Sequence, residues 1–302
     1  MICRRPDPPP GPPRPVPETA AASAAGCARS RPAPAAGGET PRSLRHRGAA
    51  LVWVGLLALC FGCAFPGARP RPVAYENEAV RRLMDRARTV NAGLEAVKGL
   101  GRVTVVADGG QRSYEGTAWV AAEPGRLRFA FRSPTGMPVF SMSCDPQWVT
   151  ALNHVEGDYH RRRVGDNSLS RFLPVAVTCA DLYDLLVGRM PAVAYDTVRL
   201  DREAKADGGG VALLLQRRFR GTVGRLRLAD SGDLQAVTLL DVHGNPRYEA
   251  HLEERKTVDG YRLPVRVRLE GPEGGLLVEA RRLWTAAGVD ASLFRIVPPR
   301  AP

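Results

Sequence analysis

Thiol and imidazole side chains are the groups in this sequence best suited to covalent or metal chemistry. Only two of the six cysteines, Cys144 and Cys179, lie in the part of the chain with the composition of a folded domain. In an oxidising compartment these two could pair as a disulfide, and two buried free thiols agree with the sequence equally well. Their spacing is not that of a metal site.

One small cluster, His154, Asp158 and His160, suggests metal binding or acid–base catalysis. The three residues fall on a predicted hairpin whose turn is Glu156-Gly157, so they need not converge. A further strong metal ligand is lacking nearby, and a zinc site needs three or four. We therefore predict that these side chains lie on the surface.

The other candidates for catalysis have no partners in the sequence. His243 precedes a turn, and His251 lies on the outward face of a predicted strand, neither with an evident serine or cysteine nucleophile. The Gly208–Gly210 run lacks the Lys-Ser/Thr of a phosphate-binding loop and is predicted to be a flexible turn. We expect a protein that is not an enzyme and needs no metal or cofactor.

The segment 42–62 has the features of an export signal. Three arginines and a histidine precede an apolar run of 13 residues, Ala49–Phe61, which is followed by Gly62 and Cys63. Positive, apolar and small residues in this order are typical of a signal peptide. The run is shorter than the roughly 20 apolar residues of a membrane-spanning helix.

The junction at Gly62-Cys63 resembles a bacterial lipobox, in which the cysteine becomes the first mature residue and carries acyl groups. Gly62 fits the small position before the cysteine. Cys60 and Phe61 depart from the usual residues. The resemblance implies lipidation at Cys63, and the alternative is an ordinary signal or a weak N-terminal anchor with incidental cysteines.

The sequence divides into four parts. Residues 1–41 are rich in Pro, Ala, Gly and Arg, cannot bury a core and are predicted to be disordered. A signal peptide normally begins a chain, so one hypothesis is a misassigned start codon, with the protein beginning near Leu44. Residues 42–62 are the predicted signal, 63–74 a tether, and 75–300 a single domain of the larger all-β type.

Net charge does not indicate nucleic-acid binding. The whole chain carries +12, but residues 63–302 have 35 basic and 28 acidic side chains, a net +7. The densest basic run, Arg161–Arg163, is interpreted as a solvated turn. A moderately basic surface is consistent with a neighbouring anionic membrane, whereas nucleic-acid binding would need a clustered patch or a motif.

Periodicity predicts a mainly β domain of the α+β class. Apolar residues repeat at helical spacing from Asn77 to Lys98, and shorter helices are predicted at Asn167–Leu173 and Cys179–Val187. Strands occur in consecutive series, from Gly101 to Leu152 and from Thr197 to Leu283, rather than alternating with helices. We expect a strongly curved antiparallel half-barrel of about 11 strands, its concavity covered by helices.

The clearest alternation is Arg126–Arg132, where apolar and basic residues alternate. A concave sheet would turn a set of apolar side chains inward, where they could bury acyl chains at about 0.8 kcal/mol per methylene. The same residues would serve equally as a filled core. They are Leu127, Phe129, Phe131, Phe140, Met142, Trp148, Leu263, Val265 and Val267.

Several stretches together resemble the LolB/LolA group of lipoprotein receptors and carriers. They comprise the strand ending in Ser-Pro-Thr-Gly, a hairpin, a Leu-Pro-Val step, a helix closing on Leu-Leu-Val-Gly before a proline, and the C-terminal tail. In order they are 127–136, 153–159, 173–175, 182–191 and 288–299. The resemblance implies an 11-stranded half-barrel with a helical lid and an apolar cavity. It also implies that Met137 is the tip of a loop that helps transfer cargo to the membrane; alternatively, Met137 begins a strand and points into the core.

From the signal and this resemblance, we expect a lipid-anchored lipoprotein on the periplasmic face of the outer membrane. Its expected partners are acyl chains or lipoproteins, the membrane and a periplasmic carrier protein, with a role in lipoprotein localisation. The alternative is a structural or assembly lipoprotein of the cell envelope that has a filled core and acts through its surface.

Overall fold

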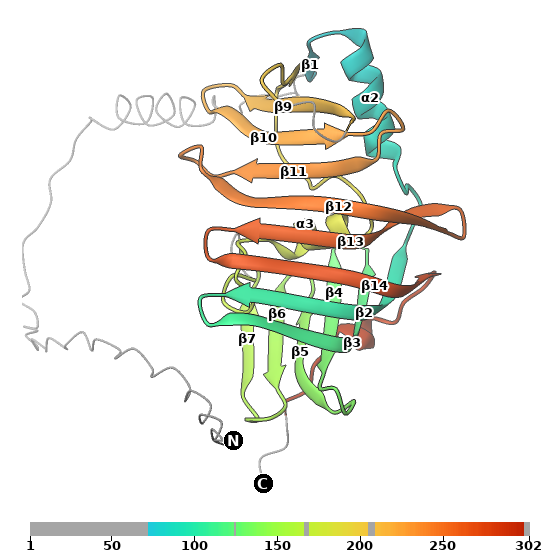
Figure 1. The fold of residues 1–302 in the computed structure, drawn as a ribbon, viewed down its shortest axis with the longest axis vertical. Coiled ribbons are helices and arrows are strands. Elements are labelled where there is room, and N and C mark those ends of the chain that lie inside the picture. The colour runs from blue at the N-terminus through green and yellow to red at the C-terminus, as the bar shows by residue number, and fades with distance from the viewer. Residues whose placement is uncertain (1–71, 124, 166–168, 205–208, 299–302) are drawn as a thin grey trace, which may run out of the picture. The chain divides into compact units, whose positions relative to one another are not determined.

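The computed structural model describes residues 72–123, 125–165, 169–204 and 209–298, all within the compact unit Arg69–Pro302. Segment 1–41, the predicted signal peptide, Cys63 and most of the tether lie outside the described residues. Those described form one 14-stranded sheet, two α-helices and a 3-10 helix (Figure 1). The elements are β1 Ala74–Tyr75, α2 Glu78–Thr89, β2 Ala96–Ala107, β3 Gly110–Ala122, β4 Arg126–Arg132, β5 Pro138–Cys144, β6 Trp148–Asn153, β7 Tyr159–Arg163, α3 Cys179–Leu186, β8 Thr197–Leu200, β9 Val211–Arg217, β10 Gly221–Leu228, β11 Leu234–Leu240, β12 Pro246–Val258, β13 Tyr261–Gly271, β14 Gly274–Ala286 and η1 Ala291–Phe294.

The sheet joins the two predicted series of strands edge to edge. Its order is β1-β8-β9-β10-β11-β12-β13-β14-β2-β3-β4-β5-β6-β7, so β14 and β2 make the junction. Neighbouring strands are antiparallel except β1, which is parallel to β8. The predicted mainly β, open and curved sheet is confirmed, with more strands among the described residues than the 11 expected.

Strong twist gives the sheet a concave face. Strands β9–β14 run across the view of Figure 1, whereas β4–β7 run down it, so the strand direction turns through a large angle along the sheet. Right-handed twist between neighbouring strands accumulates in this way. Gly99 permits one close approach in the curve, because a Cβ there would lie 2.1 Å from the Trp119 ring on the neighbouring strand.

The first helix is shorter than predicted. Asn77 caps α2 by accepting a hydrogen bond from the Val80 amide at 2.9 Å, but the helix ends at Thr89 rather than Lys98. Asn91 and Gly93 then adopt positive φ and reverse the chain into β2. The prediction was wrong because Leu94 and Val97 continue the helical spacing of apolar residues, although they are buried in the turn and in β2.

Two further predictions concern the chain that crosses the concave face. Helix α3 is confirmed, with Thr178 accepting a hydrogen bond from the Asp181 amide and Gly188 in the left-handed conformation after the helix. The predicted helix Asn167–Leu173 is wrong in its described part. Residues 169–173 form a single turn, in which the Leu173 amide donates a hydrogen bond to the Leu169 carbonyl. The side chains of Leu169 and Leu173 are buried from this turn, not from the face of a helix.

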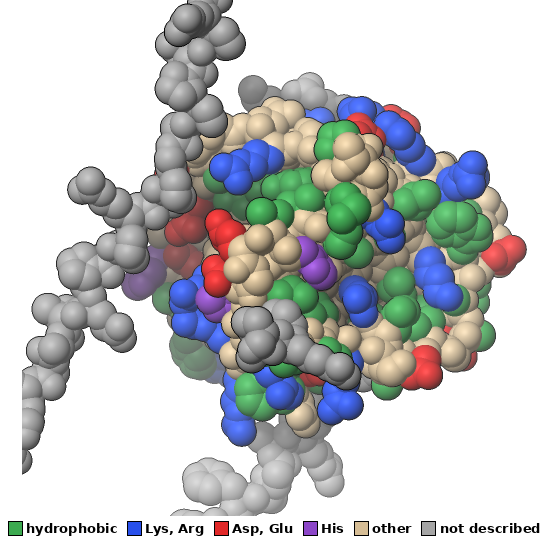
Figure 2. All heavy atoms as spheres, turned by 90° about the horizontal axis from the view of Figure 1, so that it is seen from below, with side chains coloured by type: hydrophobic (Ala, Val, Ile, Leu, Met, Phe, Trp, Pro, Cys, Tyr) green, Lys and Arg blue, Asp and Glu red, His purple; other side chains and the backbone are tan. Residues whose placement is uncertain are grey.

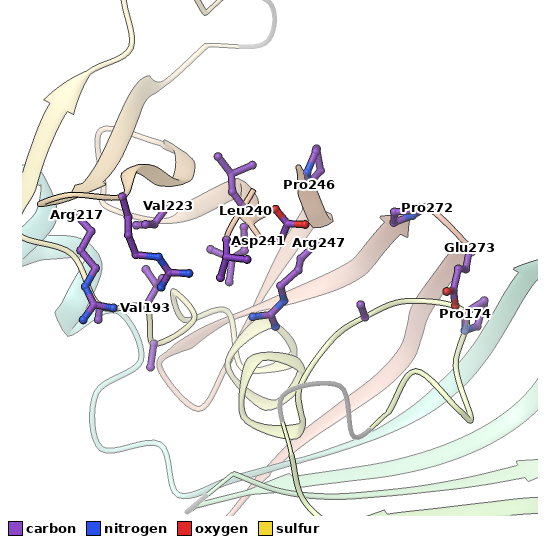
Figure 3. Close-up of a pocket in the computed structure, with 16 residues that line it drawn as sticks. Pro174, Val193, Arg217, Val223, Leu240, Asp241, Pro246, Arg247, Pro272 and Glu273 are labelled. Carbon is purple, nitrogen blue, oxygen red and sulfur yellow. The ribbon is translucent and has the colours of Figure 1, made fainter. Parts of the chain in front are cut away.

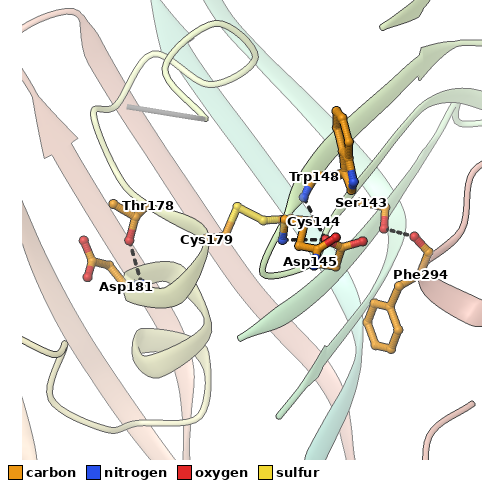
Figure 4. The surroundings of a disulfide bond; sticks show 9 residues. Ser143, Cys144, Asp145, Trp148, Thr178, Cys179, Asp181 and Phe294 are labelled. Carbon is orange, nitrogen blue, oxygen red and sulfur yellow. Dashed lines mark hydrogen bonds between the residues drawn. A yellow bond between two sulfur atoms is a disulfide. The ribbon is translucent and has the colours of Figure 1, made fainter. Parts of the chain in front are cut away.

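Cys144 and Cys179 form a disulfide (Figure 4), which decides between the alternatives that the sequence left open. Cys144 ends β5 and Cys179 begins α3, with Cα atoms 6.3 Å apart. The bond therefore fixes the start of α3 to the concave face of the sheet.

Several segments cover the concave face, and helices supply only part of this cover. Helix α2 packs near β8, and α3 contacts β3, β4 and β13. Irregular chain on either side of α3 supplies the remainder through buried side chains, namely Leu169, Leu173, Val175 and Val177. On the convex face, the C-terminal segment covers β4 and β5, where the Leu293 and Phe294 carbonyls accept hydrogen bonds from Arg128 and Ser143.

The Arg161–Arg163 run is part of a strand, not the predicted turn. It belongs to β7, which pairs with β6 alone among the described strands and forms one edge of the sheet. All three arginines are exposed. Charged side chains on an edge strand disfavour pairing with another chain, so this run has a structural explanation that needs no ligand.

Candidate functional site

Five of the predicted cavity residues form a continuous apolar surface on β4 and β5. Phe129 lies directly opposite Met142, and Phe131 opposite Phe140, so these side chains share the concave face with Leu127. The rings of Phe129 and Phe131 are 5.9 Å apart, and those of Phe131 and Phe140 are 5.6 Å apart. All but Phe140 are almost completely buried.

The other four predicted residues do not extend this surface as one group. Leu263 and Val267 on β13 are buried in the same core. Trp148 lies on the opposite face of the sheet, where the Arg161 guanidinium is 4.2 Å from its ring. Val265 is half-buried beside a shallow depression that it shares with Arg102 and other ion-paired residues.

Helix α3 occupies the space between β4 and β13. Its Leu182, Leu185 and Leu186 side chains are buried in the core that contains Phe129 and Val267. In this arrangement the apolar surface on β4 and β5, which we call the β4–β5 wall, contacts the protein's own side chains. A ligand would reach most of it only after α3 and the adjoining segments had moved.

Open space lies at the rim of the concave face, between the cover and β9–β13. A cavity of about 750 Å³ has aliphatic walls from Val193, Val223 and Leu239, and three arginines border it (Figure 3). Binding sites for small ligands typically enclose 300–1,000 Å³. The full lining comprises Pro174, Ala176, Ala192–Ala194, Arg217, Arg220, Val223, Leu239–Val242, Pro246, Arg247, Pro272 and Glu273. We call this space the rim cavity.

A second opening, the aromatic pocket, lies on the other side of the cover. Its volume is about 380 Å³, and Tyr114, Phe131, Phe140 and Phe172 contribute rings to its lining. Phe172 and Leu173 border this pocket, while Pro174 and Ala176 border the rim cavity. Residues 172–176 therefore separate the two openings, and the aromatic pocket is where two predicted residues, Phe131 and Phe140, can be reached.

Charges are unevenly distributed around the rim cavity. Arg247 pairs with the buried Asp181 at 3.1 Å, whereas Arg217 and Arg220 form no ion pair with a described residue. Burial raises the pKa of Asp181, an effect that Arg247 opposes. Burial, together with the neighbouring Asp181 carboxylate, raises the pKa of Asp184 to about 7.

Sequence reasoning did not identify the rim cavity. Leu213 and Leu215, or Val237 and Leu239, alternate with more exposed neighbours as the inward residues of a strand do. No local pattern distinguishes a strand beneath a cover from a strand beneath a cavity. The arginines at the rim lie in turns and at strand ends, where basic residues are ordinary.

Other predicted site residues have these positions. Met137 is 66% exposed in the turn before β5, as the loop-tip alternative requires, and Cys63 lies outside the described residues. His154 contacts Ser141 at 2.8 Å, and His160 packs near Phe172.

Among the described residues, no group of three or more His, Cys, Asp or Glu side chains could hold a metal ion. No helix in the described ranges has the length and apolar character required to cross a membrane.

Solved structures with the same architecture are known. A domain assigned to outer membrane lipoprotein sorting, from Vibrio parahaemolyticus, aligns with a TM-score of 0.51 at 10% identity, over 72% of this chain and 94% of its own. A DUF1329 family protein from Desulfovibrio piger aligns with a TM-score of 0.52 at 11% identity, over 72% of this chain and 98% of its own. The described domain shares the fold of these two proteins, in line with the fold that the LolB/LolA resemblance predicts.

A LolA superfamily protein from Nitrosomonas europaea is a further match, with a TM-score of 0.49 and 11% identity over 72% of this chain and 97% of its own. No protein-family model and no curated protein sequence matches the chain. At these identities the two matches with TM-scores above 0.5 establish the fold alone, and the function of the domain has to be argued from the site.

Proposed function

We propose that this protein is a lipid-anchored lipoprotein of the periplasmic face of the outer membrane, whose domain binds the acyl chains of lipids or lipoproteins during lipoprotein localisation. Cys63 would carry the anchor. Binding requires no catalysis, metal or cofactor. The fold it shares with a domain assigned to lipoprotein sorting supports the proposal.

The rim cavity is the observation that carries this proposal. It combines aliphatic side chains with an opening at the end of the strands, so an acyl chain could enter without the domain unfolding. Each methylene removed from water contributes about 0.8 kcal/mol, so about ten buried methylenes would supply the roughly 8 kcal/mol of micromolar binding. Differences in burial between a periplasmic carrier protein, this domain and the bilayer would then give transfer its direction.

A fluorescent fatty-acid probe tests binding to the full chain carrying Cys63→Ser. Ala194 is exposed and lines the rim cavity, so Ala194→Trp places a large ring in it. We expect this change to weaken probe binding at least about tenfold, or about 1.4 kcal/mol. Ala287→Trp, at an exposed site that does not line the cavity, is the matched control. A chain that binds no probe, or binds it equally in both variants, would contradict the proposal.

Anchoring and transfer need separate tests. Palmitate labelling of the wild type, absent in Cys63→Ala, would support the anchor, while equal labelling of both would refute it.

We propose Met137 as the membrane-facing tip, because it is an exposed thioether in a hairpin turn. Met137→Glu should then reduce lipoprotein transfer and leave the unfolding midpoint unchanged. Unimpaired transfer would remove Met137 from the proposal.

A second candidate function is a structural or assembly lipoprotein that acts through its surface. The packing of α3 between β4 and β13 favours it, because the centre of the concave face is filled. This candidate predicts that the purified protein carries no lipid in native mass spectrometry and does not bind the probe. Co-purified lipid that Ala194→Trp displaces would exclude it.

A further inference from the structure

The turn between β9 and β10 exposes an aromatic side chain in an unfavourable backbone conformation. Phe219 is 93% exposed, and its φ of 66° lies in the left-handed region. A non-glycine residue there costs roughly 1–2 kcal/mol. Neither packing nor backbone geometry explains a phenylalanine at this position, and unexplained strain of this kind is a reason to look for a function.

Basic side chains surround Phe219. Arg217, Arg218 and Arg220 are all exposed, the Arg218 guanidinium lies 4.9 Å from the Phe219 ring, and none of the three forms an ion pair with a described residue. We call residues 217–220 the basic tip. One acidic side chain is bound to the basic tip: the Asp196 carboxylate accepts a hydrogen bond from the Arg218 backbone amide at 2.8 Å. In the turn between β11 and β12, the Asp241 carboxylate accepts hydrogen bonds from the backbone amides of His243 and Asn245.

Other apolar side chains are exposed at the same end of the strands. Strand register places the turns before β3, β5, β7, β10, β12 and β14 along one rim. Among the described residues, seven large apolar side chains are exposed, and five lie at this rim: Val106, Met137, Val155, Phe219 and Val242. From below, where β4–β7 extend, apolar side chains lie among arginine and lysine side chains (Figure 2).

The chain also enters the domain beside the basic tip. Ala74 is paired with Thr197 in β8, and its amide bonds to the carbonyl of Asp196, the residue that also binds the Arg218 amide. Val73 follows Cys63 by ten positions along the chain, a span of about 36 Å at most when fully extended. If Cys63 carries the proposed anchor, the basic tip is therefore held within reach of the bilayer.

We propose that the basic tip docks on an anionic lipid bilayer. Phe219 enters the boundary between headgroups and acyl chains, while Arg217, Arg218 and Arg220 bind lipid phosphates. Aromatic rings and basic residues are the side chains favoured at this depth, and anionic lipids attract each nearby arginine. Because Arg217 and Arg220 also border the rim cavity, docking would bring its opening to the membrane surface. Only the step from Cys63 rests on the proposed function; docking itself does not.

Hydrogen–deuterium exchange of the full chain tests this proposal, with vesicles of phosphatidylcholine alone or with 30% phosphatidylglycerol. We expect amides 216–221 to exchange at least about fivefold more slowly with the anionic vesicles than with the neutral ones, and residues 284–288, at the other end of the strands, to be unaffected. Fivefold corresponds to the roughly 1 kcal/mol expected for one arginine near an anionic surface.

Variants identify the groups responsible. Phe219→Ser and the Arg218→Glu/Arg220→Glu double variant should each abolish the protection, and Trp284→Ser, which removes an exposed aromatic at the opposite end of β14, should retain it. Absence of protection at the tip, protection equal in both vesicles, or protection unchanged in the tip variants would overturn the proposal. Ala194→Trp should leave the protection intact, so failure of acyl binding and failure of docking are distinguishable.

Discussion

The β4–β5 wall and the rim cavity are two parts of the same concave face with different degrees of filling. On β4 and β5, aromatic side chains pack against one another and against α3, which the disulfide fixes in place. Around the rim cavity, smaller aliphatic side chains from β10 and β11 and from residues 192–194 leave about 750 Å³ open. Large side chains fill the part of the sheet that strand alternation identifies most clearly, and the open space lies where the side chains are smaller.

The largest contrast between these regions should appear in stability. Phe129→Ala removes a buried ring from the β4–β5 wall and should lower the free energy of unfolding by about 3–5 kcal/mol. Val193→Ala, at the rim cavity, should cost less than about 1 kcal/mol because the valine already borders open space. Urea denaturation measures both, and equal costs would mean that the two regions are packed alike.

The disulfide should account for the next largest effect. It links residues 35 positions apart, and replacing both Cys144 and Cys179 by serine should lower the free energy of unfolding by about 2–4 kcal/mol. A reductant should lower the melting temperature of the wild type and leave that of the double variant unchanged. If reductant affects both equally, α3 is not held to the wall by this bond.

Asp184, a partly buried acidic side chain of α3, should make stability depend on pH. The pKa of Asp184 is raised to about 7 in the folded state, above its ordinary value of 3.8, so the folded state binds the proton more tightly. Its contribution to stability is therefore fully present below about pH 4 and is lost as the pH rises through 7. Asp184→Asn should raise the free energy of unfolding at pH 8 by about 1–3 kcal/mol relative to wild type and change it little at pH 4. Parallel stability profiles from pH 4 to pH 8 would contradict this.

The smallest effect concerns the turn beside the rim cavity. Phe219→Gly relieves the positive φ and should raise the free energy of unfolding by about 0.5–1 kcal/mol while weakening association with anionic vesicles. Val242→Gly, on the adjoining exposed turn but without positive φ, should give no such gain. A loss of stability in Phe219→Gly would show that the ring is needed for folding.

Local pattern determined the strands. Arg126–Arg132 begins and ends where its alternation predicts, and the second series of strands begins at the predicted Thr197, because inward and outward side chains along one strand are set by its own backbone. The same locality explains the errors: the spacing of Leu94 and Val97 suits a helix as well as it suits a turn followed by a strand. Only the positive φ of Asn91 and its bonds to the carbonyls of Val187 and Arg262 decide between them.

By itself, the sequence determined a mainly β, curved domain and supplied the apolar side chains of its concave face. Tertiary structure decided whether that face is filled or open, because the answer depends on segments distant in sequence. Cys144 is bonded to Cys179, 35 positions along the chain, and α3 then packs against Phe129. Between Val193 and Val223 no segment fills the space, and the rim cavity remains. A strand's period specifies which way a side chain points, and only long-range packing specifies what it meets there.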